Sequence, residues 1–248
     1  MNPTVTTDEA LSDPPAERRF NLAGAPALLG LVAIIAGFWV IFASQAPGFL
    51  SSFNLFTLGR ALAVDLAPDT VYSYRLDERA GTLTEVARAQ ARPGAGPRHL
   101  TFHPGGRHAY LANEVDDTVT VCAYDPSTGR LTIGAPQSTG SRASVTNYPA
   151  QFLVTADGSY AYLANRGDNT LARYRVEAGG ARLRLLDTVA VSGDFPRHIA
   201  FSPDGALLFA ANQRSGTVSV FHVDADSGEL RLAGAPFASP VAVCALPL

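Results

Sequence analysis

The feature that most constrains this chain is a unit of about fifty residues that recurs three times in its second half. The copies begin "GPRHLTFHPGGRHAYLANEVDD", "YPAQFLVTADGSYAYLANRGDN" and "FPRHIAFSPDGALLFAANQRSG". Asn113, Asn165 and Asn212 hold the same place in each copy, so the spacings are 52 and then 47 residues. Repeats of this length built from short strands are typical of propeller blades, which pack only against their neighbours.

Each copy reads as four strands. "HLTFH", "QFLVT" and "HIAFS" alternate apolar and polar residues and end at "PGG", "ADG" and "PDG", where glycine supplies the geometry of a tight hairpin. A second strand such as "AYLAN", a third such as "TVTVCAYD" and a fourth around "LTIGA" follow. An immunoglobulin-like sandwich would need different strands in succession, whereas here the same unit recurs.

A partial copy, "LAVDLAPDTVYSYRLDERAGTL", begins at Leu62 and aligns without gaps onto "LANEVDDTVTVCAYDPSTGRLT" 49 residues later. This alignment places Asp65 at the position of Glu114, where we interpret it as a turn residue. The pattern therefore predicts an all-β fold, a partial β-propeller of about three and a half four-stranded blades, over residues 62–248.

The N-terminal region has a different character, because residues 20–59 carry no charge. Residues 25–44, "APALLGLVAIIAGFWVIFAS", form an apolar stretch long enough to span a bilayer core of roughly 30 Å as a helix. A buried core helix and a signal peptide, whose apolar region is about 7–15 residues, are the alternatives. Arg18 and Arg19 precede the stretch, so the positive-inside rule predicts a single-pass membrane protein with a cytoplasmic N-terminus.

Three regions follow from this reading: a polar tail (1–19), a hydrophobic, transmembrane segment (20–61) and the partial propeller (62–248). The net charge of −3 provides no basic surface for nucleic acid. Cys122 and Cys244 are far apart without CxxC spacing, which argues against a disulfide framework or a zinc site. His99 and His103 are spaced to meet on a helix but are predicted on a strand, so we expect no metal and no cofactor.

The repeats also carry a resemblance. "GPRHLTFHPGGRHAYLANEVDDTVTV", "FPRHIAFSPDGALLFAANQRSGTVSVF" and the closing "SPVAVCALPL" resemble the lactonase family of seven-bladed β-propellers, which includes 6-phosphogluconolactonases and fungal muconate-lactonising enzymes. Seven blades of about 49 residues need roughly 340 residues, so the resemblance implies that the first three and a half blades are missing. It also implies hydrolysis of a small-molecule sugar lactone without a cofactor.

A second resemblance concerns residues 20–67. "LLGLVAIIAGFWVIFASQAPGFLSSFNLFTLGRALAVDLA" is similar to the opening of a sugar-type ABC importer permease, but no further spans follow, so transport is excluded. We interpret the chain as a chimera whose seam lies at "ALAVDLA", produced by genomic rearrangement or by a gene-model error. In the latter case the expected location is cytoplasmic.

Opening a lactone with water needs a base, donors for the carbonyl oxyanion, and cations for a phosphate or carboxylate on the substrate. The first strand of each blade lines the channel of a propeller, so residues that begin this strand lie at its rim. The resemblance implies catalytic roles for Arg98 and Glu114, and substrate binding by Arg166 and Arg197. Because of their place at this rim, His99 is a further catalytic candidate and His198 a further substrate-binding candidate. A recurring "PRH" could also be structural, although the second copy has "PAQ" there.

One departure from the family leaves two functions open. Family members carry a histidine motif before the "VDL" strand, whereas this chain has "TLGRALAVDL" without histidine. The alternative to a lactonase is therefore a non-catalytic, membrane-tethered propeller fragment, or a chimeric product without its own function. An incomplete propeller also leaves unpaired strand edges, which predicts self-association through these edges.

Overall fold

A computed structural model describes residues 60–247, and this part of the chain is built almost entirely from antiparallel β-strands. The first sheet consists of β1 (Arg60–Asp65), β2 (Thr70–Asp77) and β3 (Thr82–Gln90). The second consists of β4 (Pro97–Phe102), β5 (His108–Asn113), β6 (Thr118–Asp125) and β7 (Arg130–Ser138).

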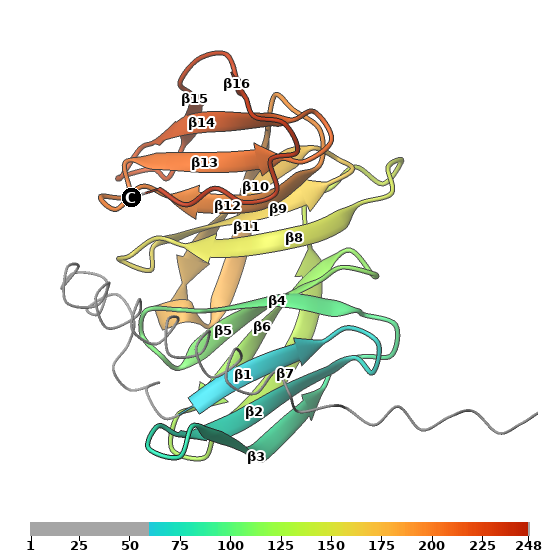
Figure 1. Ribbon diagram of the computed structural model, residues 1–248, viewed down its shortest axis with the longest axis vertical. Helices are drawn as coiled ribbons and strands as arrows, with labels where there is room; N and C mark the ends of the chain where they lie inside the picture. The colour runs from blue at the N-terminus through green and yellow to red at the C-terminus, as the bar shows by residue number, and fades with distance from the viewer. Residues whose placement is uncertain (1–59, 248) are drawn as a thin grey trace, which may run out of the picture. The chain divides into compact units, whose positions relative to one another are not determined.

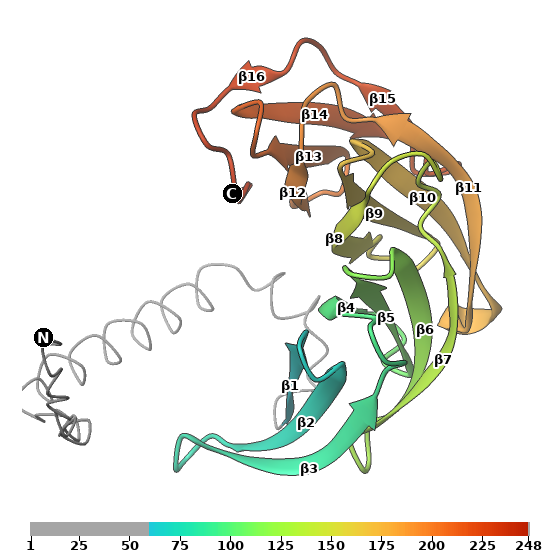
Figure 2. The same cartoon turned by 90° about the vertical axis from the view of Figure 1, so that its right-hand side faces the viewer.

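The third sheet consists of β8 (Tyr148–Val154), β9 (Tyr160–Arg166), β10 (Thr170–Glu177) and β11 (Arg182–Ala190), with the short 3₁₀ turn η3 (Ala178–Gly180) between its last two strands. The fourth consists of β12 (Pro196–Phe201), β13 (Leu207–Asn212), β14 (Thr217–Val223) and β15 (Leu230–Leu232), and β16 (Phe237–Ala238) also pairs with β14. The sheets follow one another along an arc, with β4, β8 and β12 on its inner side (Figures 1 and 2). The prediction of four-stranded propeller blades is confirmed.

The first sheet corresponds to the last three strands of a blade, as the partial copy predicted, but its register differs by one residue. Asp65 pairs with Thr70 across the turn in the same way that Asn113 pairs with Thr118. Asp65 therefore corresponds to Asn113, 48 residues later, and not to Glu114. The gapless alignment was wrong because it matched "VD" with "NE", whereas the strand pairing is set by the turn that follows.

No helix within residues 60–247 is long and apolar enough to cross a membrane. The segment predicted to do so, residues 25–44, lies outside the described residues, and its membrane role stays a prediction.

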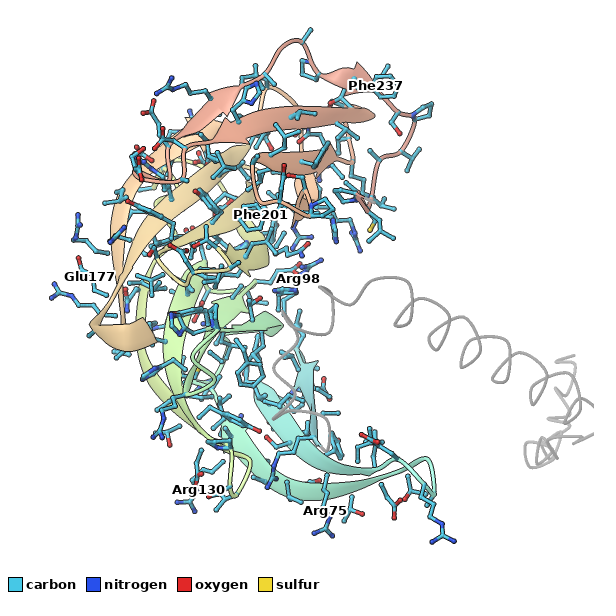
Figure 3. All side chains as sticks on the ribbon, turned by 90° about the vertical axis from the view of Figure 1, so that its left-hand side faces the viewer. Arg75, Arg98, Arg130, Glu177, Phe201 and Phe237 are labelled. Carbon is cyan, nitrogen blue, oxygen red and sulfur yellow. The ribbon has the colours of Figure 1, made fainter. Side chains whose placement is uncertain are left out.

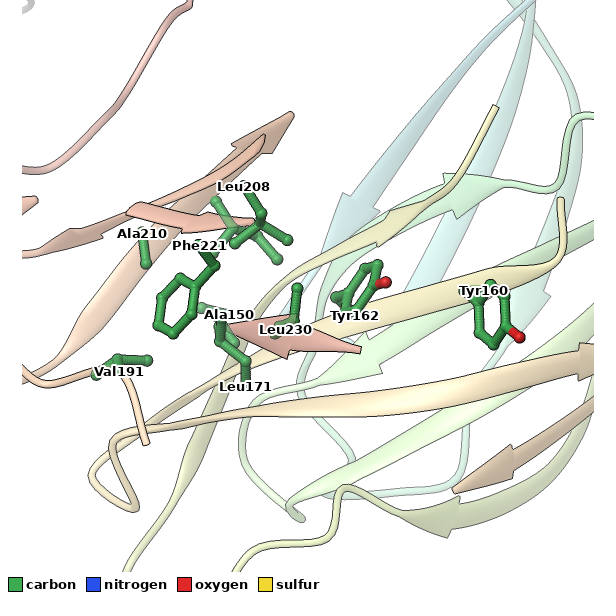
Figure 4. Packing of buried hydrophobic residues seen from close by; sticks show 11 residues of the cluster. Ala150, Tyr160, Tyr162, Leu171, Val191, Leu208, Ala210, Phe221 and Leu230 are labelled. Atoms are coloured by element: carbon green, nitrogen blue, oxygen red, sulfur yellow. The ribbon is translucent and has the colours of Figure 1, made fainter. Parts of the chain in front are cut away.

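Three hydrophobic clusters lie between successive sheets. One joins the first two sheets around Leu111 and Val71, and the next joins the second and third around Tyr110 and Phe152, whose ring centroids are 5.1 Å apart. The cluster in Figure 4 joins the third and fourth sheets around Phe221. Each fully buried side chain of this size contributes about 1.5–3 kcal/mol through the hydrophobic effect. The fold is thus stabilised mainly between neighbouring repeats.

Side-chain hydrogen bonds between successive blades reinforce this packing. In three sheets the turn between the second and third strands of the blade (β1–β2, β5–β6 and β9–β10) ends at a residue with positive φ. These residues are Asp69, Asp117 and Asn169. Asp69 accepts the backbone N–H of Gly96 at 2.7 Å, and Asn169 accepts that of Phe195 at 2.8 Å. Asp and Asn tolerate this left-handed conformation and bond nearby backbone groups well. These hydrogen bonds hold the segment that leads into the first strand of the next blade.

Candidate functional site

Three charged side chains converge where the first strands of the arc begin. Arg98 Nε lies 2.9 Å from Oε2 of Glu114, and Arg166 Nη2 lies 2.7 Å from the same oxygen. The side chain of Arg166 is only 5% exposed, whereas those of Arg98 and Glu114 are each 23% exposed. Figure 3 shows Arg98 on the inner side of the arc, with Glu177 and Arg130 on its outer side. The ion-paired cluster is therefore accessible to a small molecule from the channel side.

The blade repeat explains how these side chains reach one another. Glu114 and Arg166 hold equivalent positions, because each directly follows the buried asparagine, Asn113 or Asn165, that ends the backbone pairing of the second and third strands. Arg98 is the second residue of β4, in the same blade as Glu114. Arg166 belongs to the next blade and reaches back to the preceding one. The site is thus formed across a boundary between blades.

A small residue replaces arginine in the middle blade. Arg98 and Arg197 follow the prolines that begin β4 and β12, and Ala150 holds this position in β8. Ala150 is fully buried within the hydrophobic cluster of the third and fourth sheets. The cation that the third sheet contributes to the rim is thus Arg166, at the end of β9, and not a residue of β8.

Several partners hold the buried guanidinium of Arg166 in place. It donates to the backbone carbonyls of Tyr148 at 3.0 Å and Pro149 at 3.4 Å. Its Cζ lies 5.3 Å from the ring centroid of Phe195, and Cζ of Arg214 lies 3.8 Å from the same centroid. The cation–π contact of Arg166 with Phe195 and its ion pair with Glu114 offset the cost of removing this cation from water.

Phe195 adopts an uncommon backbone conformation to make these contacts. Its φ is 65°, in the left-handed region that favours glycine, and Gly96 has a φ of 60° at the equivalent position before Pro97. A bulky residue in this region costs about 1–3 kcal/mol, and such strain often marks functional sites. Neither Phe195 nor Arg214 was identified from the sequence, where the only available signal was the exchange of glycine for phenylalanine before "PRH".

Positive charge dominates the rim. Burial lowers the pKa of Arg98, and the nearby charges of Arg166 and Arg197 lower it further, against the opposing effect of Glu114. Arg197 itself is exposed and donates to Oε1 of Gln213 at 3.3 Å. Three guanidinium groups thus accompany one carboxylate, which is a suitable environment for an anionic ligand.

The predicted histidines contact the backbone of the following first strand. Nδ1 of His99 accepts the N–H of Phe152 at 3.3 Å, and Nδ1 of His198 accepts that of Ala245 at 3.3 Å. Gln151 holds the equivalent position in the middle blade and accepts the N–H of Ile199 through Oε1 at 3.2 Å. This bond explains why glutamine can replace histidine in the second copy, since both side chains supply a neutral acceptor.

Burial keeps these imidazoles neutral. It lowers the pKa of His99 to about 4, with further lowering by the charges of Arg98 and His198. It also lowers the pKa of His198, again with a contribution from Arg98. The geometry gives both histidines a positioning role between blades, and their predicted catalytic and binding roles stay predictions.

A groove of about 1210 Å³ runs along the inner side of β4, β8 and β12 towards the hairpin turns that follow them, past His99, Gln151 and Phe201. Arg98, Glu114 and Arg166 are not among the residues that line it. We place the candidate site at the charged cluster and not in this groove, because the groove is open and mainly apolar. Within residues 60–247 no group of three His, Cys, Asp or Glu side chains could hold a metal ion.

Repeated four-stranded sheets, arranged in an arc with their first strands inside, define a protein of the β-propeller class. The family model described as "Lactonase, 7-bladed beta-propeller" matches residues 56–247, so the chain belongs to this lactonase family. The predicted family is confirmed. The match begins at residue 56 and β1 at Arg60, both before the boundary predicted at residue 62.

Individual relatives agree with this assignment. The 6-phosphogluconolactonase of Bacillus subtilis (strain 168) is 34% identical over 137 residues, which are 55% of this chain and 39% of that protein. A solved structure of a Lactobacillus plantarum protein has a TM-score of 0.71 at 34% identity and covers 75% of this chain and 54% of that one. The Pseudomonas aeruginosa periplasmic gluconolactonase PpgL has a TM-score of 0.67 at 31% identity, with 74% and 52% covered. The chain therefore spans about half or less of the length of these relatives.

Proposed function

We propose that this chain binds a sugar lactone carrying an anionic group, of the 6-phosphogluconolactone type, and hydrolyses its ester bond at the Arg98–Glu114–Arg166 cluster. The observation that carries the proposal is a carboxylate held by guanidinium groups from two neighbouring blades, within a rim of net positive charge. Membership of the lactonase family and relatives named 6-phosphogluconolactonase and gluconolactonase support it.

Each residue has a distinct role in the proposed reaction. A water molecule attacks the lactone carbonyl carbon, and the carboxylate of Glu114 takes its proton. The guanidinium of Arg98 stabilises the negative charge that develops on the carbonyl oxygen. The C–O bond to the ring oxygen then breaks, and the proton passes from Glu114 to this oxygen to give the open hydroxy acid. Arg166 holds Glu114 in position throughout.

In this proposal the exposed Arg197 binds the anionic group of the substrate. Arg197 lies near enough to Arg98 to lower the pKa of that residue, yet its only described hydrogen bond is to a neutral amide. It is therefore available to bind a phosphate or carboxylate of the substrate. This role predicts that a phosphorylated lactone is preferred over a neutral one.

The test is hydrolysis of 6-phosphoglucono-δ-lactone and of glucono-δ-lactone by the purified full chain, corrected for the spontaneous rate. Arg98→Ala and Glu114→Gln should lower kcat/KM by about 10²–10⁴. Arg197→Ala should raise KM for the phosphorylated substrate alone. Arg130→Ala, which removes an exposed arginine on the outer side of the arc, is the matched control and should retain full activity.

The non-catalytic alternative has its own supporting observation. Within the described residues, the first sheet starts at the equivalent of a second strand, so one wall of the inner surface is not formed by residues 60–247. A spontaneous rate in every variant would favour the alternative and would contradict lactone hydrolysis by this chain.

A further inference from the structure

The fourth sheet repeats the arginine–glutamate contact of the second sheet with one change. Arg98 and Arg197 are the second residues of β4 and β12. Arg98 contacts Glu114, and Arg197 contacts Gln213, which holds the same position after the buried asparagine of its blade. The amide of Gln213 accepts a hydrogen bond but carries no charge. The contact therefore holds Arg197 in place without neutralising its positive charge.

A second exposed arginine, Arg214, directly follows Gln213. Its Cζ lies 3.8 Å from the ring centroid of Phe195, so the guanidinium rests closely on the ring. Its backbone N–H donates to the carbonyl of Asp194 at 3.1 Å, which fixes the start of the side chain. The five N–H donors of a guanidinium lie in its plane, and neither contact uses them. Arg214 is thus held by groups that leave its donors available to a ligand.

The equivalent positions in the second and third sheets carry no charge. Val115 follows Glu114, and Gly167 follows Arg166. A Cβ atom on Gly167 would lie 2.3 Å from the carbonyl oxygen of Thr146, so a longer side chain does not fit there. The exposed arginine at this position is therefore a feature of the fourth blade and not of the repeat.

Other arginines of this rim are already ion-paired. The rim arginines that lie 2.6–2.9 Å from a carboxylate oxygen are Arg92 (with Asp116), Arg98 (with Glu114), Arg142 (with Asp168) and Arg166 (with Glu114). Among residues 60–247, no carboxylate forms an ion pair with Arg197 or Arg214. Asp194, which is close to both in the sequence, accepts a hydrogen bond from Asn169 at 2.9 Å. Within this part of the chain, the fourth blade thus presents two guanidinium groups without a counter-charge.

Both arginines lie close to the charged cluster. Arg197 is near enough to Arg98 for its charge to lower the pKa of that residue. Cζ of Arg166 lies 5.3 Å from the ring centroid of Phe195, so it is separated from Cζ of Arg214 by at most the sum of the two centroid distances, 9.1 Å. A small molecule bound at the charged cluster can therefore reach both arginines with a group at its other end.

We propose that Arg197 and Arg214 form an anion site for the phosphate of the substrate, with Phe195 as the platform that orients Arg214. The identity of the ligand rests on the proposed function, to which Arg214 is added as a residue that determines specificity. Two guanidinium groups suit a phosphate, because its oxygens accept paired N–H donors and its charge of about −1.5 to −2 needs two cations. A neutral lactone gains nothing from these donors, so Arg214 selects the phosphorylated substrate.

Titration of inorganic phosphate into the purified full chain tests the site without reference to catalysis. Isothermal titration calorimetry at neutral pH and constant ionic strength should show binding at millimolar phosphate. Arg214→Ala should weaken this binding about 10-fold or more, because it removes charge-assisted hydrogen bonds. Circular dichroism spectra that match that of the unmodified chain show that the variants fold.

Arg92→Ala is the matched control for this titration. Arg92 is an exposed arginine of the same rim, but its charge is already paired with Asp116. This variant should bind phosphate as the unmodified chain does. Equal weakening by Arg92→Ala and Arg214→Ala would overturn the inference, because it would show only a general effect of positive charge.

Hydrolysis kinetics provide a second, separate measurement. Arg214→Ala should raise KM for 6-phosphoglucono-δ-lactone about 10-fold, and the preference for this substrate over glucono-δ-lactone, taken as the ratio of kcat/KM values, should fall by a similar factor. An unchanged preference in a folded Arg214→Ala variant would overturn the role of Arg214 and leave the proposed function intact.

Failure of the proposed function would look different. A chain that hydrolyses neither lactone, yet loses phosphate binding in Arg214→Ala, would keep the anion site and lack the lactonase activity. An unmodified chain that binds no phosphate at millimolar concentrations would overturn the anion site itself.

Discussion

Arg166 and Glu114 hold equivalent positions in neighbouring blades, yet they form an ion pair of 2.7 Å with each other. The same position of the repeat carries glutamate in one blade and arginine in the next. The two side chains therefore form a charged site between the blades. Gln213 completes the series in the following blade and bonds Arg197 at 3.3 Å. The rim therefore depends on how successive blades face one another.

Glu114→Gln should destabilise the fold by about 1–3 kcal/mol, because it leaves the buried guanidinium of Arg166 without a counter-charge. Urea unfolding of the full chain at neutral pH measures the effect. Glu85→Gln removes an ion pair with Arg88 whose side chains are 36% and 66% exposed, and it should leave the free energy of unfolding nearly unchanged, because water screens this pair. Equal effects of the two substitutions would contradict a buried role for Arg166.

Two substitutions of Phe195 should separate its effect on stability from its effect on the site. Phe195→Ala keeps the strained φ of 65° and loses the ring, whereas Phe195→Gly loses the ring but relieves the strain. We expect the glycine variant to be more stable than the alanine variant by about 1 kcal/mol. Both variants should lower kcat for lactone hydrolysis, because Arg166 loses its stacking partner and holds Glu114 less firmly. Thermal unfolding together with steady-state kinetics separates the two effects.

Acid should loosen the contact that His99 makes between blades. The folded-state pKa of about 4 is below the ordinary value of 6.5, so protonation favours the unfolded chain. The stabilising contribution is complete above about pH 6.5 and is lost as the pH falls towards 4, by about 3 kcal/mol at most. Urea unfolding at a series of pH values measures this loss.

The sequence offers a matched control for the same experiment. His99→Gln copies the side chain found at Gln151, which keeps the acceptor for the N–H of Phe152 and removes the titrating group. This variant should lose less stability between pH 6.5 and 4 than the unmodified chain, while His198 titrates in both. An identical pH profile would show that His99 is not responsible.

Residues 25–44 provide a prediction that rests on the sequence alone. A tagged full chain expressed in cells should sediment with membranes, and Ile34→Arg combined with Ile35→Arg should shift it to the soluble fraction, because each charge at the centre of a span costs about 2.5–3.5 kcal/mol. Recovery of the unmodified chain entirely in the soluble fraction would contradict the span and would favour the cytoplasmic alternative.

The fold could be predicted from the sequence because its signals are local and repeated. Alternation along "HLTFH" and "HIAFS", glycine at the hairpins and the regular return of Asn113, Asn165 and Asn212 each report on one strand or turn. These signals led to four-stranded blades, to the family and to Arg98 and Glu114 as rim residues. A one-residue error remained at Asp65, where no local signal distinguishes "VD" from "NE".

Contacts between blades were decided only by the tertiary structure. Arg166 lies 52 residues from Glu114, and whether the two side chains meet depends on the packing of neighbouring sheets, on the carbonyls of Tyr148 and Pro149 and on the ring of Phe195. The common role of His99 and Gln151 was likewise hidden, because imidazole and amide differ as residue types but accept the same backbone N–H. Strand periodicity is a property of adjacent residues, whereas these contacts arise from the packing of one repeat against the next.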